Sequence, residues 1–162
     1  MKIYLDDERA TPQGWRRCYW PEEVIALLKT EQVTEISLDH DLGDDNHGTG
    51  YDVVLWIEEA VALRGFRPPR LQVHSANASA REKMLAGIQT ITRLADRQQQ
   101  IDTLLNHIAT YWRLNPRLQF HELAESLIPG GAMVLDGPDR DDAALLAALN
   151  HMPPKVSLGN RS

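Results

Sequence analysis

Three short apolar runs in the first half of the chain each end in a cluster of polar residues. Residues 2–5 lead into Asp6-Asp7, residues 35–38 lead into Asp39-His40-Asp41, and residues 71–73 lead into His74-Ser75-Ala76-Asn77. Apolar runs of this length, bounded by polar residues, are typical of short buried strands. The pattern therefore predicts three strands that carry polar side chains at their carboxyl ends.

Helical patterns lie between and after these runs. Pro21 suits a first helical position, residues 51–63 repeat apolar side chains at turn-like spacing, and Ser79 can cap a further helix that runs past residue 91. This alternation predicts the α/β class, with a parallel sheet and flanking helices. Residues 18–20 can add one more short strand. Ligands of such sheets bind at the carboxyl ends of the strands, so we expect the three polar clusters to meet in one crevice.

The pattern changes after about residue 95. Residues 96–100 are polar, and the apolar stripe that follows from residue 101 to Trp112 has helical spacing and ends before Pro116. Further helices are predicted at 118–127 and 139–149. We therefore expect an α/β domain over 1–95, a small all-α region over 99–152, and a flexible tail over 153–162.

The acidic net charge limits which classes of partner the chain is expected to bind. The net charge is 17 − 23 = −6, and residues 1–52 alone carry five Lys and Arg against twelve Asp and Glu. A broad duplex-DNA surface needs clustered cations, so duplex DNA is not expected as a partner. The single cysteine, Cys18, permits no intrachain disulfide. With neither a leader-like start nor an apolar run of about 20 residues, we expect a cytoplasmic protein without membrane contact.

The acidic strand ends suggest a metal site. Carboxylates, together with water and substrate oxygens, are the ligands that Mg²⁺ prefers. Asp6, Asp7 and Asp39 are the predicted metal ligands, because both acidic strand ends should face the same crevice. The alternative is that Asp6-Asp7 belongs to a solvated turn.

Other residues near the strand ends suit a phosphate. The candidates for substrate binding are the hydroxyl of Ser75, the amide of Asn77, the guanidinium of Arg9, and Thr49 in a Gly-Thr-Gly loop before a helix. Each has a structural alternative as well. Ser75 and Asn77 suit a strand-to-loop turn, the glycines beside Thr49 suit a tight turn, and Arg9 suits an exposed surface position.

Two histidines add possible proton transfer. His40 and His74 each adjoin a residue predicted to contact metal or phosphate, and an imidazole titrates near neutral pH. We therefore predict that Asp39, His40 and His74 are catalytic. The aromatic residues Trp15, Tyr19 and Trp20 either pack in the domain or stack on a nucleotide base.

These motifs together resemble a known family. The segments from Leu5 to Arg9, from Ser37 to Gly43 and from Val73 to Asn77 are similar to receiver domains of two-component signalling, and more closely to the receiver-like group described as cyclic-phosphate processing. The resemblance implies a truncated, flavodoxin-like receiver fold over residues 1 to about 93. It also implies that Asp6 and Asp7 bind metal, that Asp39 is the phosphoacceptor or third ligand, and that Ser75 contacts the phosphoryl group.

The sequence departs from ordinary receivers at one important position. Receivers place a lysine at the end of a fifth strand, whereas no apolar strand followed by lysine comes after Asn77. The added His40, Asp41 and His74 match the cyclic-phosphate group better. For that group the resemblance implies metal-assisted chemistry on phosphoesters, including the 2′,3′-cyclic phosphates of cleaved RNA.

Two functions remain open from the sequence. The first is a Mg²⁺-dependent phosphoesterase or cyclic-phosphate-processing enzyme that acts on cyclic nucleotides or on RNA ends with a 2′,3′-cyclic phosphate. The second is a non-enzymatic receiver-type module that accepts phosphate on Asp39 or sequesters a phosphorylated nucleotide signal. In either case the partner is a phosphorylated small molecule or an RNA end. Residues 99–152, which resemble uncharacterised bacterial helical proteins, are expected to mediate a homodimer or to bind a protein.

Overall fold

The computed structural model describes residues 1–120, 122 and 123. The chain divides into two compact units, Met1–Gln98 and Gln99–Ser162, which are described separately below. The helix predicted at 139–149 and the tail predicted at 153–162 lie outside the described residues, as does most of the helix predicted at 118–127. In the described part of the chain, no helix combines the length and the apolar character needed to cross a membrane.

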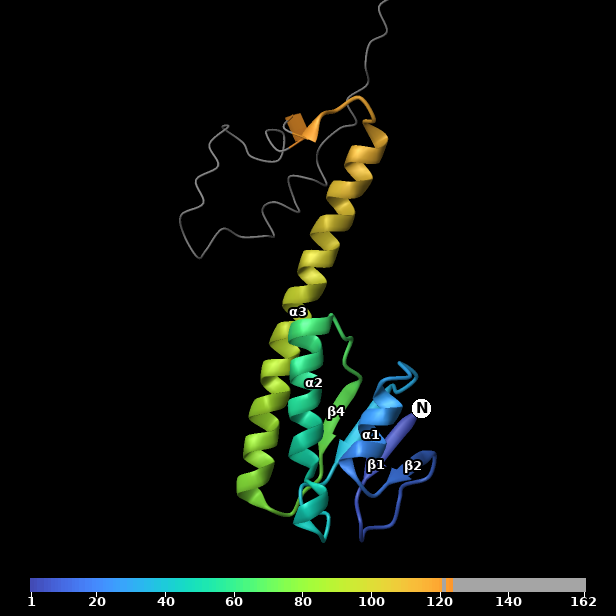
Figure 1. The fold of residues 1–162 in the computed structure, drawn as a ribbon, viewed down its shortest axis with the longest axis vertical. Helices are drawn as coiled ribbons and strands as arrows, with labels where there is room; N and C mark the ends of the chain where they lie inside the picture. Colours follow the sequence, from blue (N-terminus) through green and yellow to red (C-terminus); the bar gives the residue numbers. More distant parts are fainter. Residues whose placement is uncertain (121, 124–162) are drawn as a thin grey trace, which may run out of the picture. The chain divides into compact units, whose positions relative to one another are not determined.

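The first unit is built on a parallel sheet of four strands, shown in Figure 1. The strands are β1 (Lys2–Leu5), β2 (Trp15–Cys18), β3 (Glu35–Leu38) and β4 (Arg70–Val73), in the spatial order β2-β1-β3-β4. The predicted α/β class is therefore confirmed. The extra strand was predicted at residues 18–20, but it lies at Trp15–Cys18. As an edge strand with two arginines, β2 lacks the apolar run that marked the other three strands.

In the described part of the chain, helix α1 (Pro21–Leu28) follows β2, α2 (Gly50–Arg64) follows β3 and α3 (Ala78–Leu114) follows β4. A short 3₁₀ turn occupies Asp45–His47. The ends of the helices follow local rules. Pro21 opens α1, and Thr49 and Asp52 form a reciprocal capping box at the start of α2. Gly65, with φ of 68°, ends α2 in the left-handed conformation that glycine tolerates best.

Helix α3 is longer than the sequence suggested. The polar stretch 96–100 was predicted to separate two helices, yet α3 continues through it to Leu114. Polarity alone does not break a helix, since Arg and Gln have good helix propensity and residues 88–114 contain no Gly or Pro. In the second unit, Tyr111, Leu118 and Leu123 are buried in a small cluster.

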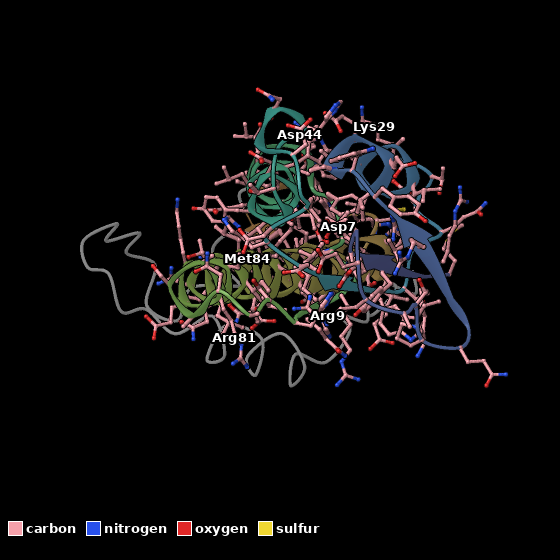
Figure 2. The ribbon with its side chains drawn as sticks, turned by 90° about the horizontal axis from the view of Figure 1, so that it is seen from below. Asp7, Arg9, Lys29, Asp44, Arg81 and Met84 are labelled. Carbon is pink, nitrogen blue, oxygen red and sulfur yellow. The ribbon has the colours of Figure 1, made fainter. Side chains whose placement is uncertain are left out.

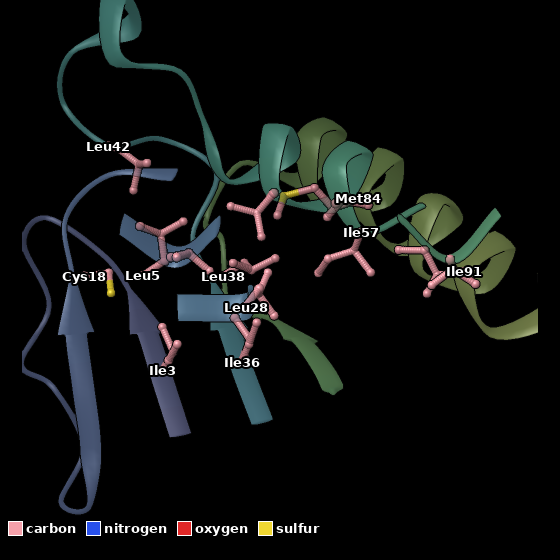
Figure 3. Packing of buried hydrophobic residues seen from close by; sticks show 14 residues of the cluster. Ile3, Leu5, Cys18, Leu28, Ile36, Leu38, Leu42, Ile57, Met84 and Ile91 are labelled. Atoms are coloured by element: carbon pink, nitrogen blue, oxygen red, sulfur yellow. The ribbon is translucent and has the colours of Figure 1, made fainter. Parts of the chain in front are cut away.

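The core of the first unit lies on one face of the sheet. Figure 3 shows Ile3, Leu5, Ile36 and Leu38 pointing toward the helices, where the packed residues include Ile57, Met84 and Ile91. Side chains alternate along a strand, so the residues between these face the opposite side. We call that side the helix-free face, because the described helices of this unit all pack on the core side. Eight strand residues make up the helix-free face: Lys2, Tyr4, Trp15, Arg17, Glu35, Ser37, Arg70 and Gln72.

Candidate functional site

The sheet ladder continues one residue beyond the strands and sets the direction of the strand-end side chains. The N–H of Asp39 donates to the carbonyl oxygen of Leu5 (2.9 Å), and that of His74 donates to Leu38 (3.0 Å). The N–H of Asp6 donates to Cys18 in the same way (3.2 Å). By alternation, Asp6, Asp39 and His74 continue the helix-free face. One potential ligand atom from each of these three residues lies within 4.8 Å of the others.

Asp6 is fully buried and is held by four hydrogen bonds. Its Oδ1 accepts from the N–H groups of Glu8 (2.8 Å) and Arg9 (2.5 Å). Its Oδ2 accepts from Arg9 Nη1 (3.0 Å) and is 2.9 Å from His74 Nε2. Burial by itself raises the pKa of Asp6, but these hydrogen bonds stabilise the anion and bring the pKa down to about 2. Asp6 is therefore ionised at neutral pH.

Arg9 places a positive charge between the two buried carboxylates. Its Nη1 donates to Oδ2 of Asp6 and to Oδ2 of Asp39. These hydrogen bonds and the charge of Asp39 raise the pKa of the Arg9 guanidinium. Figure 2 shows Arg9 on the other side of β1 from Asp7. The two carboxylates are thus arranged to share one cation.

The backbone beside Asp39 is fixed by the start of α2. A Cβ atom at Gly50 would lie 1.8 Å from the carbonyl oxygen of Asp39, so only glycine allows this approach. The N–H of Gly50 donates to the carbonyl oxygen of His40 (3.1 Å), and the N–H of His40 donates to Asp39 Oδ1 (2.7 Å). Gly50 is therefore required for close backbone packing, a role that neither the phosphate-binding nor the tight-turn interpretation of the Gly-Thr-Gly loop included.

The His74 ring lies between Ser37 and Asp6 and forms a hydrogen bond with each. Its Nε2 faces Asp6 and its Nδ1 is 2.7 Å from the hydroxyl of Ser37, while the ring stacks on Tyr4 with the centroids 4.3 Å apart. An ionised carboxylate can only accept a hydrogen bond, so Nε2 carries a proton. In the neutral ring, Nδ1 is then the acceptor for the Ser37 hydroxyl. These two hydrogen bonds orient Asp6.

Ser37 was not among the residues predicted for the site. It is buried in the middle of β3, two residues before Asp39 on the same face. The available signal was a single hydroxyl within an otherwise apolar run, Ile36-Ser37-Leu38. A buried polar residue two positions from a candidate ligand shares its face of the strand, so alternation identifies this kind of residue once the strand is known.

Asp7 and His40 do not join this cluster. The carboxylate of Asp7 lies against Gly43: a Cβ atom at Gly43 would be 2.8 Å from Oδ2 of Asp7. Gly43 also has a positive φ of 77°, which favours glycine at this position. His40 Nε2 is 3.9 Å from Asp41 Oδ1, and within the described chain its buried Nδ1 has no hydrogen-bond partner. The metal role of Asp7 and the catalytic role of His40 stay predictions.

The remaining candidates form local structure near the same strand ends. Oγ of Ser75 accepts from the N–H of Asn77 (3.2 Å), and Oδ1 of Asn77 accepts from the N–H of Ala80 (3.1 Å) in the first turn of α3. Oγ1 of Thr49 accepts from the N–H of Tyr51 (3.3 Å). All three side chains therefore stabilise helix starts or turns, and their predicted phosphate contacts are not tested by this geometry.

Comparison with known families identifies the first unit. Residues 1–90, more than half of the chain, match the family model described as the cyclic-phosphate processing receiver domain. The chain belongs to this family. No curated protein and no solved structure matches the chain. The receiver-like resemblance seen in the sequence motifs is thus confirmed.

This cyclic-phosphate processing receiver differs from ordinary signalling receivers in its described sheet. Strand β4 is followed directly by α3, and the described residues contain no fifth strand that could supply the usual lysine. In addition, β1 and β2 are joined by the short segment 6–14 without a helix. That segment instead carries Asp6 and Arg9, two residues of the polar cluster.

Proposed function

We propose that this receiver domain is a metal-dependent phosphoesterase that opens cyclic phosphate esters. The observation that carries the proposal is the pair Asp6 and Asp39, two buried carboxylates that face each other across a shared positive charge. Family membership supports the cyclic-phosphate class of substrate. Both cyclic nucleotides and RNA ends with a 2′,3′-cyclic phosphate contain that group.

The donor set fits a hard divalent cation. Asp6 and Asp39 offer carboxylate oxygens, and the low pKa of Asp6 keeps its charge available at neutral pH. Mg²⁺ commonly takes one or two carboxylates and completes its octahedron with water and phosphate oxygens. Asp6 and Asp39 would hold the ion. When bound, Mg²⁺ would supply charge stabilisation for the phosphoryl group and would orient a water molecule.

The other residues have roles that follow from their contacts. His74 and Ser37 hold Asp6 in one orientation, and Arg9 is close enough to the carboxylates to bind a phosphate placed beside them. In the reaction, water attacks phosphorus, one of the two ester P–O bonds breaks, and the leaving oxygen takes up a proton. His40, whose Nε2 lies near Asp41, is the proposed source of that proton.

Asp39→Asn provides the central test. The substitution removes one carboxylate charge with little change of shape, and we expect turnover of a 2′,3′-cyclic nucleotide or a cyclic-ended oligoribonucleotide to fall by at least about a hundredfold. Mg²⁺ should raise the melting temperature of the wild type and not that of the variant. Turnover and thermal shift are measured on the full chain.

Glu59→Gln is the matched control, because Glu59 is an exposed carboxylate on α2 that pairs with Arg64. It should keep both the turnover and the Mg²⁺ shift. Unchanged turnover in Asp39→Asn would contradict the proposal. So would a stable phosphoryl adduct on Asp39 after treatment with a small phosphodonor, if no substrate were consumed.

A further inference from the structure

The helix-free face is unusual for a sheet of this kind. All-parallel sheets normally have helices on both faces, since each face must otherwise contact solvent or a partner. Here the connections β2–α1–β3 and β3–α2–β4 run in one direction across the sheet and place their helices on the core side. The connection from β1 to β2 runs in the opposite direction and contains no helix. Among the described residues of the first unit, the face that a crossover helix would cover therefore carries strand side chains and part of the segment 6–14.

This face combines positive charge with aromatic rings. Among the eight strand residues of the face, Lys2, Arg17 and Arg70 outnumber the single carboxylate of Glu35, so these residues carry 3 − 1 = +2 in a chain of net charge −6. Lys2 bonds Glu35 at 2.8 Å and Arg70 is 3.9 Å from it, which leaves the positive charge in excess. The Arg70 side chain is 77% exposed. Such a surface attracts phosphates.

The aromatic side chains lie among these cations. Trp15 is partly exposed at the edge of the sheet, with Lys2 Nζ 5.3 Å from its ring centroid and Tyr4 against it edge to face. Tyr19 follows β2 on the same side, is 47% exposed, and has the guanidinium of Arg17 5.3 Å from its ring centroid. Rings between cations are the pattern on which bases of a single strand stack while its phosphates pair with the cations.

The face is continuous with the candidate active site. Lys2, Tyr4 and Asp6 follow one another on one side of β1, and Glu35, Ser37 and Asp39 do so on β3. Four residues at about 3.3 Å per residue place the Lys2 row roughly 13 Å from the Asp6 row. Arg17 also connects the two regions, because its guanidinium bonds Thr11 Oγ1 and the carbonyl oxygen of Asp7 in the segment 6–14.

We propose that the helix-free face binds single-stranded RNA and leads the RNA end into the site of Asp6 and Asp39. The inference rests on the proposed function for the identity of the end group, and it names a polynucleotide rather than a mononucleotide as the substrate. Charge complementarity favours this occupant. A second copy would bring two positive faces together, and an apolar helix would bury Lys2 and Arg70 away from water without a counter-charge.

Binding is measured by fluorescence anisotropy with a labelled short oligoribonucleotide that ends in a 3′-hydroxyl, with EDTA present so that nothing turns over. Trp15→Leu should weaken binding roughly tenfold through lost stacking. Arg70→Gln, at an exposed position on the opposite edge strand, should weaken binding of the RNA. It should also lower the magnitude of the slope of log affinity against log salt concentration by about one, the amount expected for one lost phosphate contact. Lys29→Gln is the charge-matched control at the end of α1, away from the helix-free face, and should bind like the wild type.

The outcomes separate this inference from the proposed function. Equal binding by the wild type, Trp15→Leu and Arg70→Gln would overturn the inference, even if the wild type turns over cyclic nucleotides. Binding that depends on Trp15 and Arg70 would support it, even if Asp39→Asn leaves turnover unchanged. A wild-type dimer that Arg70→Gln dissociates, without RNA binding, would show that a second copy occupies the face.

Discussion

The two faces of this sheet use alternate residues of the same strands for different purposes. On β3, Ile36 and Leu38 are fully buried beneath the helices, whereas Ser37 and Asp39 point to the other side and belong to the polar network. On β1, Ile3 and Leu5 alternate in the same way with Tyr4 and Asp6. The core side stabilises the fold by apolar burial, and the helix-free side carries the charges. Neighbouring residues can therefore be substituted to change one property and leave the other.

This separation explains how two buried carboxylates, Asp6 and Asp39, are held at the ends of two adjacent strands. Burying an unpaired charge is costly, and the hydrogen bonds to Asp6 more than offset that cost, so its pKa lies below the ordinary value. Three of its donors come from Glu8 and Arg9 in the segment after β1, and the fourth comes from His74 at the end of β4. Apolar burial on the core side of the sheet stabilises the fold and offsets the cost of burying these carboxylates.

The largest effect on folding is expected from Ile36→Ala. Ile36 is fully buried in β3, one of the two inner strands, and removing such a side chain typically costs about 2–5 kcal/mol, because apolar contacts are lost and a cavity remains. Urea unfolding of the full chain measures the loss. Since apolar contacts carry no charge, the loss should be the same at pH 7 and pH 4. A loss below about 1 kcal/mol would contradict the distinction between the two faces.

The sequence predicted the fold from its alternation of strands and helices, and it predicted that Asp6, Asp39 and His74 would meet because each follows a short apolar run. Two of these strands are buried, whereas β4 is an edge strand with no buried residue. The sequence could not show that Asp7 and His40 diverge from the other three residues. The direction of a side chain just after a strand depends on where the ladder ends, and the ladder here extends through Asp6, Asp39 and His74. The position of β2 was missed because an edge strand needs few apolar residues.

A smaller, pH-dependent effect is expected for Asp6. Its pKa is about 2 in the folded protein, below the ordinary value of 3.8, so its ionisation stabilises the fold above about pH 4. That contribution, about 2 kcal/mol, should be lost as the pH falls from about 4 toward 2. In Asp6→Asn the free energy of unfolding should be lower at pH 7 and should change less over this range than in the wild type.

Glu59→Gln, which removes an exposed carboxylate of the helical layer, should keep the wild-type acid dependence. An Asp6→Asn variant with the full wild-type dependence between pH 4 and pH 2 would show that other carboxylates control acid stability. In that case the two faces of the sheet would not differ in how they contribute to the pH dependence of stability.

The smallest effect on stability, and the most specific to the site, is expected from Ser37→Ala. The loss of the hydrogen bond to His74 should cost about 1 kcal/mol, well below the cost at the neighbouring Ile36. Without the hydroxyl, Nδ1 of His74 loses its hydrogen-bond donor, whereas Asp6 still accepts from the protonated Nε2. ¹⁵N NMR of the imidazole measures this directly: Nε2 should carry the proton in both proteins, and the resonance of Nδ1 should shift in Ser37→Ala because Nδ1 has lost its hydrogen bond.

Ser37→Thr keeps a hydroxyl at this position and should restore the wild-type ring spectrum. If Ser37 served only to fill space, alanine and threonine would leave the His74 nitrogens unchanged. A shift in Ser37→Ala that threonine reverses would instead show that the residue beside Ile36 acts through His74 on Asp6. Two adjacent residues of β3 would then have different roles: Ile36 stabilises the fold, and Ser37 orients the site.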